Sequence, residues 1–255
     1  MTTAIMQPTY LPWAGYFNLI HRAERFVFLN DVKFEKSSWQ TRNRILLQGR
    51  VHFITAPTSG SRNQLICEVA LAKGDFRSKH QRLLEQAYAK HPHGPELLEV
   101  VLPVLSDPCL EKLQDLNMQL ILALCRALGV ASEFLRSSEL GPEGERSARL
   151  VSLLQKFGER DYLSPPGSAD YIAEDGLLEP AGVRVEYQHF EPLPYPQRAA
   201  TTFEPRLSIV DVVANLGFEL GQKYVTQALE PSSLSELAAR PSLPGPGGSG
   251  LRVEP

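Results

Sequence analysis

The segment from Met6 to Phe17 constrains the fold more than any other part of the chain. The short apolar run of residues 3–6 predicts a strand, and residues 17–23 predict a helix. Two prolines and two aromatic residues in residues 8–13 predict a stiff turn between them. Such a unit presents backbone N–H groups and the positive end of a helix dipole, which suits an anion or a nucleotide. A rigid structural turn with aromatic rings in the core is an equally good reading of these residues.

The rest of the chain alternates between predicted strands and helices. Strands are expected at residues 25–30, 67–72, 134–136, 162–164 and 183–190, and a hairpin at 44–55 around Gln48 and Gly49. Helices are expected at residues 76–90, 94–105, 110–128, 146–157 and 208–216. In the last helix, Ser208 is expected as N-cap and Asp211 as the acid of a capping box. This order predicts an α/β fold with a mostly parallel, Rossmann-like sheet and a helical insertion at about 76–128.

Composition sets the domain limits and excludes several classes of protein. Residues 1–229 are expected to form one domain, and residues 230–255, rich in Ser, Pro and Gly, a disordered tail. A net charge of −3 and a pI near 6.1 argue against nucleic acid as a partner. No apolar run is long enough for a membrane span and no leader is visible, so a cytoplasmic location is expected. The cysteines have no paired spacing, and Cys125 is expected as a core thiol. The histidines show no metal spacing, so no metal site is predicted.

Four sequence blocks resemble one known family. The first is Gln-Pro-Thr-Tyr-Leu-Pro-Trp-Ala-Gly-Tyr-Phe at residues 7–17, and the second comprises residues 28–34 and 39–45. The third comprises residues 146–150, 161–164 and 167–171, and the fourth residues 195–197, 203–211 and 215–217. Together they resemble the WbqC-like family of bacterial surface-polysaccharide gene clusters. The third block departs from the family pattern, because Ser-Pro-Pro-Gly stands at residues 164–167 where Ser-Gly and a further Gly are expected.

The resemblance implies a function in the transfer of an aminoacyl group, such as glycine, to an amino sugar. The strand, turn and helix at the N-terminus also look like the HIGH-type nucleotidyltransferase and ligase superfamily. The signature histidine of that motif is missing, since Gln7 and Tyr10 occupy the region, so adenylate chemistry is a weak analogy.

Candidate site residues come from the blocks and from their expected place at strand and helix ends. Three are predicted to be catalytic: Asp31, Tyr10 and Asp170. The residues predicted to bind substrate are Gln7, Trp13, Tyr16, Asn43, Arg44, Arg146, Arg149, Ser164, Gly167, Ser168, Tyr171 and Gln197. Asp31 follows the second expected strand, where α/β sheets place ligand-binding groups, although a turn-capping Asp would look the same.

Two groups of cations in this set have competing explanations. Arg146 and Arg149 lie in the first turn of a helix, where a cation opposes the dipole unless an anion is bound. An exposed pair near Glu143 or Glu145 is the alternative. Arg44 has forked N–H donors that suit a phosphate or a carboxylate. The alternative is that Arg44 and the basic residues near it simply form a solvated loop.

The sequence therefore predicts a transferase that moves a small acyl or aminoacyl group to an amine of a sugar or related metabolite. Its substrate would be an amino sugar or a nucleotide-linked compound, and an acyl-carrier protein is a candidate partner. The sequence identifies no cofactor. The alternatives are a non-catalytic ligand-binding or scaffold protein of the same pathway, supported by the absence of a recognisable nucleophile and base, and an ATP-dependent ligase or nucleotidyltransferase.

Overall fold

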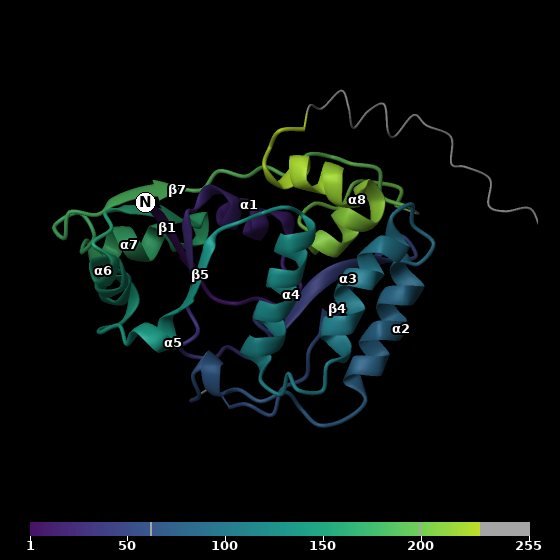
Figure 1. Ribbon diagram of the computed structural model, residues 1–255, viewed down its shortest axis with the longest axis horizontal. Helices are drawn as coiled ribbons and strands as arrows, with labels where there is room; N and C mark the ends of the chain where they lie inside the picture. The colour runs from purple at the N-terminus through teal and green to yellow at the C-terminus, as the bar shows by residue number, and fades with distance from the viewer. Residues whose placement is uncertain (62, 199, 230–255) are drawn as a thin grey trace, which may run out of the picture.

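A five-stranded parallel sheet forms one half of the molecule and a group of helices with a hairpin forms the other. The computed structural model describes residues 1–61, 63–198 and 200–229. Figure 1 shows the sheet with α6 and α7 on the left, and α2, α3, α4, α8 and the hairpin on the right. The structure confirms the expected α/β class with a mostly parallel, Rossmann-like sheet.

The sheet has the strand order β5-β2-β1-β6-β7, and every neighbouring pair is parallel. Its strands are β1 (Thr2–Met6), β2 (Arg25–Phe28), β5 (Glu133–Arg136), β6 (Asp161–Ser164) and β7 (Arg184–Tyr187). The order reverses between β1 and β6. In open α/β sheets, ligands bind outside the carboxyl ends of the strands at such a switch point.

Side chains of the central strands point alternately to the two faces of the sheet, and each face has its own apolar core. Ala4, Phe26 and Phe28 belong to the larger apolar cluster, which includes α1 (Ala14–Arg22) and the helical half. Ile5 and Val27 point to the opposite face and pack with α6 (Arg146–Phe157). Since successive strand residues face opposite sides, one apolar run of sequence supplies both layers.

The predicted hairpin is present and lies outside the main sheet. Strands β3 (Arg42–Leu47) and β4 (Arg50–Thr55) pair only with each other. The turn residues Gln48 and Gly49 have φ values of 51° and 75°. Two successive positive φ values match the right-handed twist of a hairpin, and Gly adopts them without strain.

The helical insertion is also present, between β4 and β5. It consists of α2 (Phe76–Tyr88), α3 (Gly94–Ser106) and α4 (Leu113–Ala127). Cys125 is buried in α4, as expected. The strand expected at 67–72 is wrong: the chain forms the 3-10 turn η1 (Ile66–Glu68) and isolated bridges there, because its backbone groups pair with separate loops. The remaining elements are α5 (Ser137–Leu140), η2 (Pro166–Ser168) and α7 (Ala169–Asp175).

The last helix, α8 (Ile209–Val225), begins as predicted but without the capping box. The Ser208 hydroxyl accepts a hydrogen bond from the Val210 N–H at 3.4 Å. The Asp211 carboxylate bonds instead to tyrosines of other elements, and the Ser208 N–H donates to the carbonyl of Arg44. The helix is interrupted at Gly217, whose φ is 79°.

Residues 230–255, expected as a tail, lie outside the described residues, and the domain limits stay a prediction. Within residues 1–61, 63–198 and 200–229, the structure contains no helix with the length and apolarity needed to cross a bilayer.

Candidate functional site

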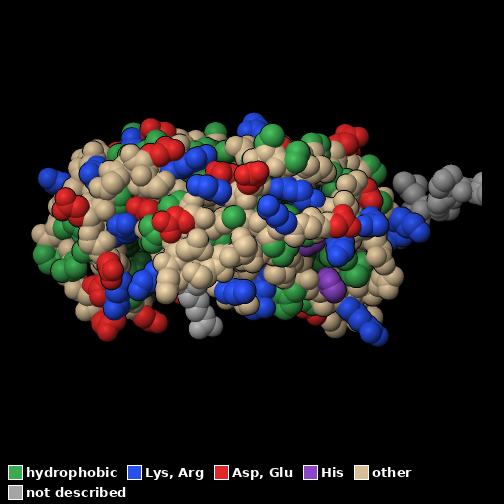
Figure 2. Space-filling view, turned by 90° about the horizontal axis from the view of Figure 1, so that it is seen from below, with side chains coloured by type: hydrophobic (Ala, Val, Ile, Leu, Met, Phe, Trp, Pro, Cys, Tyr) green, Lys and Arg blue, Asp and Glu red, His purple; other side chains and the backbone are tan. Residues whose placement is uncertain are grey.

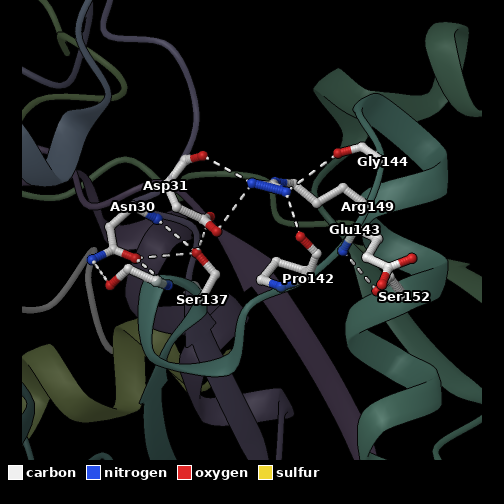
Figure 3. A network of polar contacts seen from close by, with 9 residues as sticks. Asn30, Asp31, Ser137, Pro142, Glu143, Gly144, Arg149 and Ser152 are labelled. Carbon is white, nitrogen blue, oxygen red and sulfur yellow. Dashed lines mark hydrogen bonds and ion pairs between the residues drawn. The ribbon is translucent and has the colours of Figure 1, made fainter.

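A polar network lies at the carboxyl ends of β2 and β5. Asp31 follows β2, and its carboxylate accepts hydrogen bonds from the Ser137 hydroxyl and from Arg149 Nη2, the latter at 3.1 Å (Figure 3). Ser137 is the first residue after β5, so two adjacent strands deliver the two side chains. The side chains of Arg149 and Asp31 are only 17% and 11% exposed. This ion pair is therefore largely shielded from water.

Arg149 is held in place by four hydrogen bonds. Its Nη2 donates to the backbone carbonyl of Asp31 at 3.1 Å as well as to the carboxylate. Its Nη1 donates to the carbonyls of Pro142 and Gly144 at 3.0 and 3.2 Å (Figure 3). The guanidinium joins the start of α6 to the end of β2. The anion expected near the start of this helix is thus one of the protein's own carboxylates.

Arg146 lies apart from this network. Its guanidinium pairs with Glu174 at 2.6 Å and Asp175 at 3.3 Å, both of α7, and lies 5.8 Å from the ring of Tyr171. The bond from Arg146 to Glu174 raises the pKa of Arg146, so its charge is retained. The two arginines predicted as one anion site therefore bind different carboxylates, and their contact with a ligand stays a prediction.

The side chain of Asn30, the residue before Asp31, extends the network to α4 and α5. Its Nδ2 donates to Gln114 of α4 at 2.6 Å and to Ser138 at 2.8 Å, and its Oδ1 accepts from Ser137 and the Ser138 N–H. The sequence reasoning missed Asn30, Ser137 and Ser138. The rule that selected Asp31, a polar residue directly after a predicted strand, would also have found Ser137, whereas Asn30 was expected inside the strand at 25–30.

The turn after β1 is fixed by polar side chains from distant segments. Gln7 Oε1 accepts from Gln40 Nε2 at 2.9 Å, and Asn117 of α4 donates to the carbonyls of Pro8 and Gln40. Tyr16 donates to the Gln7 carbonyl at 3.0 Å. Two predicted site residues, Gln7 and Tyr16, are thus brought together at the carboxyl end of β1.

Tyr10 is fully buried in this turn. Its hydroxyl lies 2.8 Å from Nδ1 of His80 in α2, and burial raises the pKa of Tyr10. The ring of His80 is buried too, and burial lowers the pKa of His80 to about 4. The pair is neutral and joins the turn to the helical half. A catalytic role for Tyr10 stays a prediction.

Trp13 covers the start of α1. A Cβ on Gly15 would lie 2.2 Å from the Trp13 ring, so the indole packs directly on the first turn of the helix. The use of this turn as a phosphate cradle stays a prediction.

Asn43 and Arg44 connect the hairpin to two loops. Asn43 Nδ2 donates to the Tyr10 carbonyl at 3.2 Å, and Arg44 Nη2 donates to the carbonyls of Pro205 and Arg206 at 2.9 and 3.1 Å. Arg44 therefore anchors two loop carbonyls, and its contact with a ligand stays a prediction.

Substitution of Arg44 by lysine tests this anchor. We expect Arg44→Lys to lower the free energy of unfolding by about 1–2 kcal/mol, because a lysine cannot reproduce the two carbonyl contacts of the fork. Chemical denaturation of both proteins measures the difference. An unchanged unfolding free energy together with a weakened ligand affinity would instead make Arg44 a binding residue.

Four predicted residues lie at the end of β6 and in the segment that follows it: Ser164, Gly167, Ser168 and Asp170. The Ser164 and Ser168 hydroxyls bond to each other, and Ser168 also donates to the Pro165 carbonyl at 2.7 Å. Asp170 is exposed in the first turn of α7, and a side chain at Gly167 would meet open space. The structure brings Ser164 next to β1 through the strand pairing, but no hydrogen bond or ion pair joins Asp170 to Asp31 within the described residues.

Gln197 belongs to a second buried network, centred on Asp211 of α8. Tyr195 and Tyr88 donate to the Asp211 carboxylate at 2.7 and 3.2 Å, and Gln197 Nε2 lies 3.4 Å from it. Burial raises the pKa of Asp211 to about 6, although these hydrogen bonds act in the opposite direction. Tyr88 comes from α2, so only the tertiary structure reveals this cluster.

The described residues contain no group of His, Cys, Asp or Glu that could hold a metal ion. The larger surface hollow, of about 610 Å³, lies between α2 and α3 and shares no residue with the Asp31 network. A second hollow of about 420 Å³ borders the network at Glu143 and Gly144. We place the candidate site at the carboxyl edge because its polar groups converge there, whereas the larger hollow is mainly apolar.

Comparison with known proteins agrees with the sequence blocks. A family model described as "WbqC-like protein family" matches residues 7–223. The "Uncharacterized protein Rv1507c" of Mycobacterium tuberculosis (strain ATCC 25618 / H37Rv) is 29% identical over 218 residues, which cover 85% of this chain and 94% of that protein. No solved structure matches.

Proposed function

We propose, from the premise that this chain belongs to the WbqC-like protein family, that it transfers a small acyl or aminoacyl group to an amine. The acceptor is an amino sugar or a related metabolite, and the donor is an activated acyl group such as a carrier-protein thioester. The reaction takes place at the carboxyl edge of the parallel sheet.

The observation that carries this proposal is the fixed carboxylate of Asp31. Arg149 and Ser137 each donate to one of its two oxygens, and the ion pair is largely buried. An ionised carboxylate has about four acceptor positions, so it can accept further hydrogen bonds from an ammonium or amine. A carboxylate whose direction is already set loses little entropy when it binds a substrate.

The sheet topology supports the same location. The strand order reverses between β1 and β6, next to Gln7, which follows β1, and Ser164, the last residue of β6. Asp31 follows β2, the other neighbour of β1. An acceptor bound across these three strand ends would lie where α/β folds usually bind small molecules.

The chemistry required of the site is modest. The acceptor nitrogen attacks the acyl carbon of the donor, the leaving group departs, and the nitrogen gives up one proton. Asp31 orients the amine through its N–H groups and accepts this proton. Positioning of the two substrates can lower the barrier of such a reaction by about 7–11 kcal/mol.

Asp31→Asn tests the proposal. The amide keeps the shape but loses the negative charge, so we expect acceptor binding to weaken by about 1–3 kcal/mol, roughly 5- to 150-fold. Calorimetric titration with glucosamine as the amine probe measures this, with Asp75→Asn, a change to an exposed carboxylate that is ion-paired with Arg82, as the matched control. Binding of the amine with equal affinity to wild type and Asp31→Asn would contradict the proposal.

A second candidate is a ligand-binding protein without catalysis. It is favoured by the hydroxyls of Ser137, Ser164, Ser168 and Tyr10, each of which is engaged in a hydrogen bond within the fold. Saturable amine binding without acyl transfer from any thioester donor would select this candidate. The ATP-dependent alternative is disfavoured by the missing signature histidine of the HIGH-type motif, since Gln7 and Tyr10 occupy that region.

A further inference from the structure

An exposed group of one cationic and two aromatic side chains lies on and beside the β3–β4 hairpin. We call Trp39, Arg42 and Phe53 the hairpin platform. The Trp39 and Phe53 rings are 6.5 Å apart at 29°, and the Arg42 guanidinium lies 4.8 Å from the centre of the Phe53 ring. Trp39 and Phe53 are 52% and 46% exposed. The three groups form a stack that is open to solvent.

Such exposure is costly for large apolar side chains. Burying one of them in the core would contribute about 1.5–3 kcal/mol. Val51 is a third exposed apolar residue, and it shares a face of β4 with Phe53 because strand side chains alternate. Arg50 and His52 belong to the opposite face. The apolar exposure is therefore concentrated on one face of the hairpin.

The platform also carries positive charge that the fold leaves without an acidic partner. Arg149 and Arg184 form ion pairs, whereas Arg42 has none among the described residues. Arg44 lies opposite Phe53 in the hairpin register and bonds to backbone carbonyls. An anionic ligand would supply the missing counter-charge.

The platform adjoins the carboxyl edge of the sheet. The Tyr10 N–H donates to the Trp39 carbonyl at 3.0 Å, and the neighbouring Gln40 side chain donates to Gln7, directly after β1. Figure 2 shows the molecule from the side on which α5 and the other carboxyl-edge elements lie, with Lys and Arg side chains spread across the middle of this face.

We propose that the hairpin platform binds a nucleoside diphosphate, with the base stacked on Trp39 and the phosphates near Arg42. A planar base matches the aromatic face, and a diphosphate matches the unpaired guanidinium. A nucleic-acid strand would need a longer basic groove, while this platform holds two rings and the chain has a net charge of −3. The inference rests on the proposed function and deepens it, since it makes the substrate nucleotide-linked.

Calorimetric titration of the full-length protein with uridine diphosphate and adenosine diphosphate tests this inference. We expect both to bind more tightly than uridine, which lacks phosphate, and than inorganic pyrophosphate, which lacks the ring. Trp39→Ala should weaken binding roughly 5- to 150-fold, the equivalent of about 1–3 kcal/mol for a stacked base. Arg42→Ala should weaken the binding of the two diphosphates more than it weakens the binding of uridine.

The chain offers two matched controls. Tyr187→Ala removes another exposed aromatic side chain, on the edge strand β7, and Arg50→Ala removes a cation from the opposite face of the same hairpin. Both should bind nucleotide as the wild type does. The proposal is overturned if the controls lose as much affinity as the platform variants, if pyrophosphate alone binds as tightly as the nucleotides, or if nothing binds.

Two further outcomes would assign the platform to a macromolecule and overturn the proposal. They are tighter binding of a single-stranded oligonucleotide than of the diphosphates, and a wild-type dimer in light scattering that Trp39→Ala dissociates. Nucleotide binding can be measured without any acyl transfer, so the two proposals can fail independently. Nucleotide binding without acyl transfer would therefore reject the proposed function and retain this inference, whereas acyl transfer to an amine without nucleotide binding would retain the proposed function and reject this inference.

Discussion

Replacing Arg149 by leucine is expected to lower the free energy of unfolding by about 3–5 kcal/mol, the cost of breaking a buried ion pair by removing one partner. The substitution leaves an Asp31 oxygen and the carbonyls of Asp31, Pro142 and Gly144 without their donor. Both side chains of the pair are largely buried, so water can replace the guanidinium only in part. Guanidinium chloride denaturation measures the loss.

Arg184→Leu is the matched control for this experiment. Arg184 pairs with Asp161, but their side chains are 78% and 42% exposed, and we expect a loss below about 1 kcal/mol. Equal losses from the two substitutions would show that Arg149 does not anchor the carboxyl edge. Arg149→Lys should give an intermediate loss, because one ammonium cannot span all four acceptors.

Acidification from pH 7 toward pH 4 is expected to lower the free energy of unfolding by roughly 3 kcal/mol. This is the net effect of two histidines that destabilise the fold in acid and one carboxyl group that stabilises it. Burial lowers the pKa of both His80 and His91 to about 4, and the charge of Arg198 also contributes at His91. Because these folded pKa values lie below the ordinary value of 6.5, the unfolded chain binds more protons between pH 6.5 and pH 4. Stability is complete above this window and is lost as pH falls through it.

Asp211 acts in the opposite direction. Its folded pKa of about 6 lies above the ordinary 3.8, so the folded state binds more protons between these values, and stability falls as pH rises through them. At 1.36 kcal/mol per pKa unit, each of the three groups contributes roughly 3 kcal/mol at most. Two histidines therefore outweigh one carboxyl group, and acid destabilises the fold.

Urea denaturation at pH 7 and at pH 5 measures this dependence. His91→Leu should reduce the difference between the two pH values, since both ring nitrogens of His91 are buried without a hydrogen-bond partner. His21→Leu, a substitution at an exposed position, should leave the difference unchanged. A wild-type protein that is equally stable at both pH values would contradict the expectation.

Local patterns in the sequence were sufficient to predict most of the secondary structure. The hairpin turn at Gln48 and Gly49, the three inserted helices and the end of α6 at Gly158 all agree with the prediction. The expected strand at 67–72 failed because its backbone groups bond to several separate segments and not to one neighbouring strand. Strand formation depends on such a partner, which local sequence does not specify.

In the candidate site, too, the sequence predicted some features and only the tertiary structure revealed others. The sequence placed Asp31 after a strand and Arg149 in the first turn of a helix, because strand and helix ends have local signals. Only the tertiary structure joined Arg149 to Asp31 and separated it from Arg146. Likewise, Asp211 looked like the acid of a capping box, whereas the fold pairs it with Tyr88, a residue 123 positions away in the sequence. Helices, the hairpin turn and the polar residues at strand ends follow from short-range backbone preferences and side-chain period, and the sequence determines them alone. Partners in buried networks depend on which elements share the core, so the packing of the whole chain decides them.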